Sequence, residues 1–411
     1  MKKVCVIGGG TVGWLTALYV KKFWKGISVT LIASSKIGIL GAGEGTTPNF
    51  GAILRGLGID ETDFLIKTKS TIKIGNDFIN WRGDGKNLVH GFNGPDSTEK
   101  YGYHFDARAV AEYFKTLGVK RKIKYIDADA VKFQKNLFGD ITTILLNNNN
   151  KIKTDFIFDC SGFNRLVIGK EYETEWISYE NELMTNAAFA YFIPQKDNLT
   201  FISKTKTKSI SMNSGWMWQA PLQHRWGCGY VFNDKYISFE DAQKEVEDYI
   251  GESIQIVKKF SFSPGSYKDV WVNNCIAIGL SGGFNEPLEA TSIMSSIMQL
   301  KRLKEINFDS EYKDEYNDFV RNINEQNMLF LRYHYMCDRN DTPFWVDYNN
   351  KEIPTKLKNI IDEDKNLIIR SEDELMKAFD MESNNYKIIF ALENYKVIYK
   401  KNSNKYNNVL I

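Results

Sequence analysis

The chain has few of the residues that build disulfide frameworks and metal sites. Its cysteines are scattered and form no C-x-x-C pair, which predicts neither a disulfide framework nor a zinc site. They are Cys5, Cys160, Cys228, Cys275 and Cys337. The four histidines are far apart in sequence, and we expect them to be structural or surface residues and not metal ligands. The missing disulfide framework favours a reducing compartment, so we expect a cytoplasmic protein. From the cysteines and histidines together, we also expect no bound metal.

Long apolar runs and a charge excess are missing too. No stretch of about 18 apolar residues occurs, so we expect no membrane span. The glycines of GGGTVG interrupt the early apolar run, and no cleavage site follows, so we expect no secretion signal. With 53 basic and 51 acidic residues, the net charge of +2 gives no electrostatic reason for binding nucleic acid.

What is present is typical of a large globular protein. Hydrophobic residues make up 43% of the 411 residues and charged residues 25%, close to the average for soluble domains. This length predicts two or three domains, or one large α/β domain with additions. The sequence does not indicate an oligomeric state, and a homodimer is the common default.

The N-terminal residues predict a nucleotide-binding unit. A buried strand ends at Ile7, a glycine turn follows, and a helix begins at about Thr11. In this G-x-G-x-x-G turn, Gly8 permits the tight turn, Gly10 lets the backbone approach a pyrophosphate, and Gly13 lets helix and strand pack closely. The amides of the helix N-terminus would then face the phosphate charge.

The second strand, ISVTLIASS, lacks an expected residue. In dinucleotide-binding folds an acid usually ends this strand and binds a ribose hydroxyl. Here Ala33, Ser34 and Ser35 stand at that place, so serine hydroxyls would have to replace the carboxylate.

Two later segments favour FAD over NAD. TDFIFDCSGF (154–163) predicts an apolar strand, and residues 273–300 predict a strand, a glycine turn and a helix. Such late returns to the nucleotide domain are typical of flavoproteins whose FAD domain is discontinuous in sequence. The alternative is an ordinary pair of strands in an α/β sheet.

Several blocks make the chain resemble the flavin-dependent halogenases, of the kind represented by the tryptophan halogenases. The W-x-W-x-x-P and E-P-L-E blocks are more specific than the glycine turn, which many flavoproteins share. The blocks, in family order, are GGGTVGW (8–14), GAGEGTTPNF (41–50), TIKIGNDFINW (71–81), YHFDARAVAEYF (103–114), DCSGF (159–163), GWMWQAPLQHRWGCGYV (215–231), GLSGGFNEPLEATSI (279–293) and RNDTPFW (339–345).

The resemblance implies an α/β fold with α+β additions, built on a Rossmann-like FAD-binding domain of the flavin monooxygenase type. We expect this domain to comprise residues 1–170 and 270–310. A strand-rich region on the substrate side would span 171–269, and a C-terminal helical region would span 311–411. The cofactor residues that it implies are Gly8, Gly10, Thr11, Val12, Gly13, Ser35, Gly43, Glu44, Gly45, Leu280 and Ile293.

The family chemistry implied is halogenation that consumes reduced FAD (FADH2) and O2. A flavin hydroperoxide oxidises a halide, and the hypohalous acid formed travels to a lysine beside the substrate. By position Lys73 matches this lysine, whereas Lys67 and Lys69 do not. Glu289 matches a glutamate that would stabilise the cationic ring or help take its proton, with Glu286 as its nearest rival.

The halide would be held by backbone amides at Thr291 and Ser292. A helix N-terminus suits an anion because its N–H groups are unpaired. The sequence departs from the family pattern at Ala290, where serine is usual, and at Ser292, where glycine is usual. The preferred halide, chloride, bromide or iodide, is therefore open.

Trp216 and Trp218 stand two residues apart in a predicted strand, so their rings point to one face. That face is either ordinary core or the wall of a site, and Pro221 marks the end of the strand. The resemblance implies a partition between flavin and substrate.

Tryptophan halogenases continue well beyond the DTPFW block, whereas here only residues 346–411 follow it. We therefore expect a more open site for an electron-rich indole, phenol or pyrrole, and free tryptophan is disfavoured. A separate NAD(P)H-dependent flavin reductase would supply the reduced FAD. The alternatives are an FAD-dependent aromatic monooxygenase and a flavin-binding protein that no longer catalyses.

Overall fold

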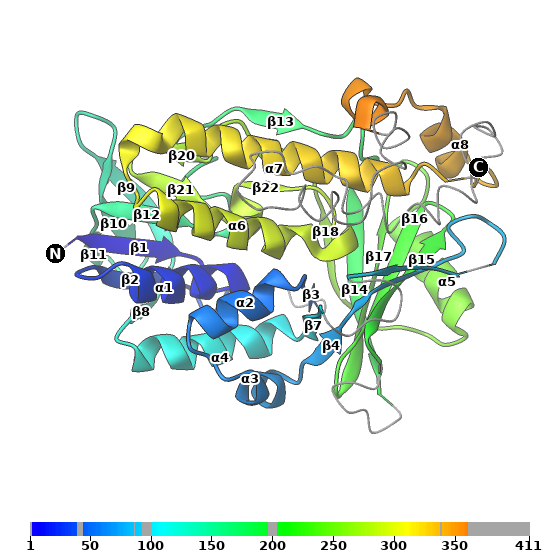
Figure 1. Cartoon of the computed structure of the whole chain (residues 1–411), viewed down its shortest axis with the longest axis horizontal. Coiled ribbons are helices and arrows are strands. Elements are labelled where there is room, and N and C mark those ends of the chain that lie inside the picture. Colours follow the sequence, from blue (N-terminus) through cyan, green and yellow to red (C-terminus); the bar gives the residue numbers. More distant parts are fainter. Residues whose placement is uncertain are drawn as a thin grey trace, which may run out of the picture.

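The computed structural model describes residues 2–38, 44–85, 87–92, 100–195, 204–337 and 339–360. Two sheets dominate it, and they lie at opposite ends of the molecule (Figure 1). The α/β fold predicted from the sequence is confirmed.

The first sheet has six strands, and its neighbours pair in parallel except for the β20–β21 pair. As predicted from the sequence, strand β1 ends at Ile7, directly before the glycine turn. In spatial order the strands are β20 (Trp271–Val272), β21 (Cys275–Ala277), β12 (Phe156–Asp159), β1 (Lys3–Ile7), β2 (Ser28–Ala33) and β8 (Lys124–Asp127). The late strands β12 and β21 thus return to this sheet, as predicted.

The second sheet has seven strands and is antiparallel except where β15 runs parallel to β5. Two of its strands, β5 and β6, come from the part of the chain assigned from the sequence to the FAD-binding unit. The order is β18 (Ile256–Ser261), β14 (Ala187–Pro194), β17 (Arg225–Phe232), β16 (Gly215–Pro221), β15 (Lys206–Met212), β5 (Gly75–Ile79) and β6 (Asn87–Gly91).

The remaining described strands form three small sheets. The first is β11 (Lys151–Lys153), β10 (Ile141–Leu146) and β9 (Ala130–Lys135); the second is β13 (Trp176–Ser178), β19 (Gly265–Tyr267) and β22 (Gly283–Phe284); the third is β3 (Glu44–Gly45), β7 (Gly102–Phe105) and β4 (Thr71–Lys73). The segment TIKIGNDFINW (71–81) is therefore divided between two sheets. Its β4 and β5 parts belong to different sheets because the chain leaves one ladder at Ile74 and enters the other.

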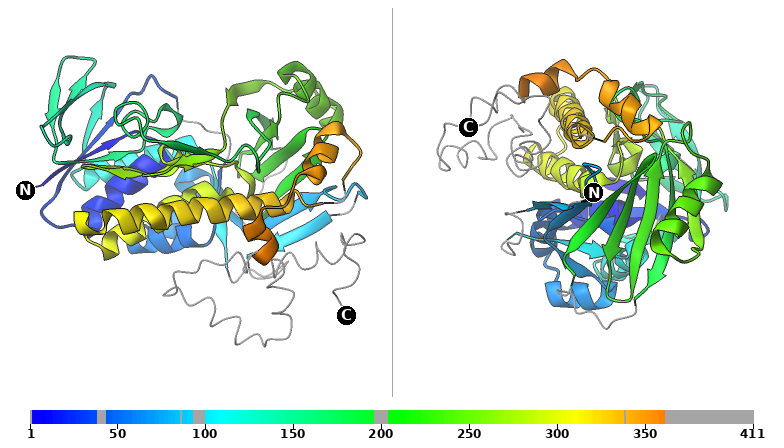
Figure 2. Two further views of the ribbon diagram at one scale, coloured as in Figure 1. Left: turned by 90° about the horizontal axis from the view of Figure 1, so that it is seen from above. Right: turned by 90° about the vertical axis from the view of Figure 1, so that its right-hand side faces the viewer.

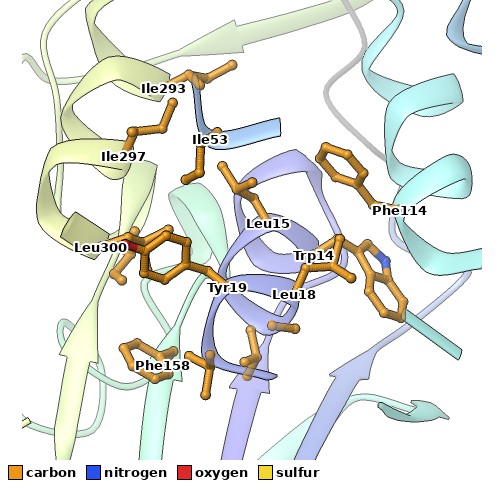
Figure 3. Packing of buried hydrophobic residues seen from close by; sticks show 14 of the residues in the cluster. Trp14, Leu15, Leu18, Tyr19, Ile53, Phe114, Phe158, Ile293, Ile297 and Leu300 are labelled. Carbon is orange, nitrogen blue, oxygen red and sulfur yellow. The ribbon is translucent and has the colours of Figure 1, made fainter. Parts of the chain in front are cut away.

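The described helices are α1 (Thr11–Phe23), α2 (Asn49–Gly56), α3 (Glu61–Thr68), α4 (Ala107–Lys120), α5 (Phe239–Ile250), α6 (Thr291–Glu305), α7 (Lys313–His334) and α8 (Pro343–Asn350). Helix α1 packs against α4 and α6. Figure 3 shows Trp14, Leu15 and Leu18 of α1 in the resulting core, with Ile297 and Leu300 of α6 nearby. None of the described helices is both long enough and apolar enough to traverse a bilayer.

Helix α7 links the two ends of the molecule. It extends from the six-stranded sheet towards the seven-stranded sheet (Figures 1 and 2). Near its C-terminus, Leu329, Leu331 and Tyr333 share a buried cluster with Trp216 and Trp218 of β16. The C-terminal part of α7 therefore belongs to the same core as the strand that carries the paired tryptophans.

Candidate active site

One cavity of about 1170 Å³ is lined both by the glycine turn after β1 and by the seven-stranded sheet. Most residues predicted for the site line it: Gly8, Gly10, Thr11, Val12, Gly13, Ser35, Gly45, Lys73, Trp216, Trp218, Leu280, Glu289, Ser292 and Ile293. Pro221 and Thr291 do not line it. Gly43 lies outside the described residues, and Glu44 is placed as part of the β3 backbone.

Of the glycines in the turn, only Gly10 has open space where a Cβ would be. A Cβ at Gly8, where φ is +116°, would lie 2.1 Å from the Cys160 carbonyl oxygen, and a Cβ at Gly13 would lie 2.0 Å from that of Gly8. A Cβ at Gly10 would meet no atom within 4 Å. The open space before Gly10 adjoins the N-terminus of α1, whose first amides favour phosphate. These residues fit the pyrophosphate of a dinucleotide.

The end of β2, where the expected acid is missing, lies beside a carboxylate from the neighbouring strand β8. Ala33 at the end of β2 pairs with Asp127 at the end of β8. The Ser35 backbone N–H donates to Asp127 Oδ1 at 2.8 Å, so Asp127 orders the serine turn. Sequence reasoning missed this residue because the pairing of β2 with β8 is a tertiary contact.

Lys73 is the last residue of β4 and is 1% exposed. Its Nζ lies 5.6 Å from the centroid of the Phe92 ring. Burial lowers the pKa of Lys73 to about 8, and the nearby Glu289 carboxylate opposes that shift. A Cβ at Gly45 would lie only 3.1 Å from Nζ, so the glycine leaves space around this nitrogen.

Glu289 is buried and has polar partners from three elements. Asn76 Nδ2 of β5 donates to Oε2 at 2.6 Å, and His90 Nδ1 of β6 lies 2.8 Å from Oε1. His334 Nε2 of α7 lies 3.4 Å from the same Oε1. Burial raises the pKa of Glu289, but His90 and His334 outweigh burial and hold it well below its usual range. Glu289 is therefore a carboxylate at neutral pH.

This geometry adds to our reading of the histidines. His90 and His334 were expected to be structural or surface residues and not metal ligands, and the fold brings both to one carboxylate. They stand on β6 and on α7, about 240 positions apart in the sequence. No spacing rule links residues so distant, and the Asn76 contact was missed for the same reason.

The backbone at Glu289 is unusual. Glu289 has φ +64° and Ala290 has φ +59°, so two consecutive residues with side chains occupy the left-handed region. Such residues cost of order 1 kcal/mol each and persist where the surroundings fix them. The two residues turn the chain from the short 3₁₀ helix Leu288–Ala290 into α6, which directs the Glu289 carboxylate towards Asn76.

Glu286, the other acid of this block, has separate surroundings. Thr185 Oγ1 donates to its Oε2 at 2.5 Å, and the Tyr335 hydroxyl donates to the same oxygen at 2.9 Å. Burial raises the pKa of Glu286 to about 7, against the effect of these donors. Glu286 does not line the large cavity, so of the two acids only Glu289 shares the cavity with Lys73.

Trp216 and Trp218 are 2% and 7% exposed and both line the cavity, with ring centroids 6.2 Å apart. A Cβ at Gly229 of β17 would lie 2.0 Å from the Trp218 ring, which explains the glycine in this strand. Pro221 ends β16, and its carbonyl accepts a hydrogen bond from Thr71 Oγ1 at 2.6 Å. The two rings are therefore packed like core while forming part of a cavity wall.

The predicted halide residues begin α6. Ser292 lines the large cavity, whereas Thr291 lines a separate polar cavity of about 20 Å³ that Ser292 also reaches. Both residues belong to the first turn, where helix amides have no intrahelical acceptor. The arrangement suits an anion at the edge of the large cavity.

Comparison with known proteins gives consistent matches over most of the chain. The family model described as tryptophan halogenase matches residues 3–100 and 93–401. Tryptophan 6-halogenase SttH of Streptomyces toxytricini is 27% identical, with 88% of this chain and 83% of the relative covered. Tryptophan 7-halogenase RebH of Lentzea aerocolonigenes is 26% identical, with 85% and 79% covered.

Solved structures agree. The crystal structure of SttH superposes with a TM-score of 0.83 at 26% identity, covering 89% of this chain and 85% of that one. Xcc4156, a flavin-dependent halogenase from Xanthomonas campestris, gives a TM-score of 0.82 at 28% identity, covering 89% and 83%.

Proposed function

This chain belongs to the tryptophan halogenase family and is an enzyme of the flavin-dependent halogenase class, and we propose that it halogenates an electron-rich aromatic ring with Lys73 delivering the halogen. The observation that carries the proposal is one cavity shared by a dinucleotide-type glycine turn, a buried lysine and a buried carboxylate. The family resemblance found in the sequence blocks is confirmed by the family model and by the relatives.

The cofactor side supports FAD. Gly8, Gly10 and Gly13 with the start of α1 would hold its pyrophosphate, and the first amides of α6 would hold the halide. When bound and reduced, FAD would supply, with O2 and halide, the oxidised halogen that the reaction needs. A separate reductase, as proposed from the sequence, would keep the cofactor reduced.

On the substrate side, Lys73 and Glu289 would have different roles. The Lys73 ammonium would donate a hydrogen bond to hypohalous acid and orient its halogen towards the ring. The low pKa of Glu289 makes it a weak base. Of the two roles expected for it, the geometry therefore favours stabilising the positive charge that develops on the ring.

Trp216 and Trp218 would separate the two sides. Their buried rings form a wall of the shared cavity and would keep the aromatic substrate away from the cofactor. Hypohalous acid is much smaller than an arene and would pass this wall more readily. This separation would favour halogenation over direct ring hydroxylation.

The substrate class proposed is an indole, phenol or pyrrole. The relatives SttH and RebH are named for tryptophan, which supports an indole as the first ring to test. The more open site expected from the short C-terminal segment depends on residues 361–411, which lie outside the described residues. Tryptophan therefore belongs in the substrate panel beside indole, phenol and pyrrole.

The test combines the enzyme, FAD, a flavin reductase with NADH, oxygen, and chloride, bromide or iodide in parallel, with products read by mass spectrometry. We expect a halogenated ring from the wild type and from Lys67→Met, the same change at an exposed lysine. Lys73→Met should bind FAD normally yet yield no halogenated product. Hydroxylated product would support a monooxygenase instead, and no product from the whole panel would support a non-catalytic flavoprotein.

A further inference from the structure

His334 is held at the C-terminal end of α7 with its ring buried. Its side chain is 1% exposed. The ring lies 5.3 Å from that of Phe78 and 4.7 Å from that of Phe330, measured between centroids. Its two nitrogens face two oxygens, Nδ1 at 2.8 Å from the Phe330 carbonyl and Nε2 at 3.4 Å from Glu289 Oε1.

These contacts fix the protons on the ring. The Phe330 carbonyl can only accept a hydrogen bond, so Nδ1 must carry a proton. If that were the only proton, the Nε2 lone pair would face a carboxylate oxygen, and two acceptors would oppose each other at 3.4 Å. The contact is attractive only when a further proton lies between Nε2 and the carboxyl group.

The other neighbours of Glu289 place that proton on His334. Asn76 Nδ2 already donates to Oε2, and His90 Nδ1 lies 2.8 Å from Oε1, where its protonated form would donate. From β4, the Lys73 ammonium adds positive charge near it. All three favour the ionised form of Glu289. His334 is also the last residue of α7, where the helix dipole stabilises a cation.

We propose that His334 is a positioning residue that remains an imidazolium and holds Glu289 as a fixed carboxylate facing the cavity beside Lys73. This inference rests on the proposed function, because it concerns the acid that would stabilise the substrate cation. A fixed negative charge needs no reorganisation when the ring becomes positive. His334 would act through Glu289 without touching the substrate.

The direct test is nuclear magnetic resonance of the full-length protein with ¹⁵N-labelled histidine at pH 7.5. Signals are assigned by substituting each of the four histidines in turn. We expect both His334 nitrogens to carry protons in the wild type, and one to lose its proton in Glu289→Gln. A single protonated nitrogen in the wild type overturns the proposal. This readout does not depend on turnover, so a failure of the proposed function is seen separately as absent product.

The kinetic test compares His334→Gln with the wild type. Glutamine can donate a hydrogen bond to Glu289 but cannot carry the positive charge. We expect KM and FAD affinity to be retained. The pH at which kcat falls to half of its maximum on the acidic side should rise by about one pH unit. His224→Gln, a change of an exposed histidine, should leave the profile unchanged. Superimposable pH profiles for His334→Gln and the wild type would contradict a charge role.

Discussion

Replacing Lys73 by methionine should make the protein more stable and inactive at once. Burial lowers the pKa of Lys73 from 10.5 to about 8. Each pH unit of that difference corresponds to about 1.4 kcal/mol, so keeping the ammonium buried costs about 3 kcal/mol at pH 7. Methionine fills similar space with a flexible apolar chain. Glu289 keeps Asn76, His90 and His334 as partners, so the substitution leaves no unpartnered carboxylate.

The gain in stability from Lys73→Met should depend on pH. Below pH 8 the lysine is protonated in both the folded and the unfolded protein, and the full cost applies. Between pH 8 and 10.5 the folded protein loses the proton first, so the cost declines. The gain from Lys73→Met should therefore be about 3 kcal/mol at pH 7 and about 1 kcal/mol at pH 10.

The assay is urea unfolding of the wild type and Lys73→Met at pH 7, 9 and 10, with halogenation measured on the same samples. Lys153→Met, a change of an exposed lysine in β11, controls for the loss of one positive charge. A folded Lys73→Met variant that is no more stable than the wild type at pH 7 would refute the reasoning. So would a gain that stays constant up to pH 10.

Three further predictions concern Glu286, the glycine turn and the tryptophan wall. Because burial raises the pKa of Glu286 to about 7, the folded protein binds this proton more tightly than the unfolded chain. Between pH 5 and 8 the unfolding free energy of the wild type should therefore fall by about 2 kcal/mol relative to that of Glu286→Gln. Urea unfolding measures this, with exposed Glu180→Gln as the control, and an equal pH dependence in wild type and Glu286→Gln would contradict it. Gly10→Ala should leave the melting temperature unchanged and weaken FAD binding about tenfold, because its Cβ enters open space at the α1 N-terminus; undiminished affinity in a fluorescence titration would refute the placement. Trp216→Phe with Trp218→Phe should release more hydrogen peroxide per halogenated product, whereas Trp226→Phe, outside the cavity lining, should not; an equal ratio in both variants rejects the partition.

Much of the cofactor side follows from the sequence. Contiguous residues encode the strand to Ile7, the glycine turn and the helix from Thr11, because each feature depends on local backbone geometry and hydrophobic periodicity. The return of β12 and β21 to the same sheet was predicted from their apolar composition and flanking glycines. Lys73 and Glu289 were selected only by family resemblance, since an isolated lysine or glutamate carries no local signal.

The substrate side depends on tertiary structure. The sequence places Trp216 and Trp218 on one strand face, but only the packing of Gly229, α7 and the cavity shows that this face is both core and wall. Two acids three residues apart, Glu286 and Glu289, have opposite pKa shifts because the neutral donors beside Glu286 do not offset its burial, whereas His90 and His334 more than offset the burial of Glu289.

Local patterns thus determined the nucleotide-binding unit and the position of the paired tryptophans. The charge state of the site was decided by contacts between segments that are distant in sequence. His90, on β6, and His334, at the end of α7, meet at Glu289. Burial and partner charge control ionisation, and both are properties of the assembled fold.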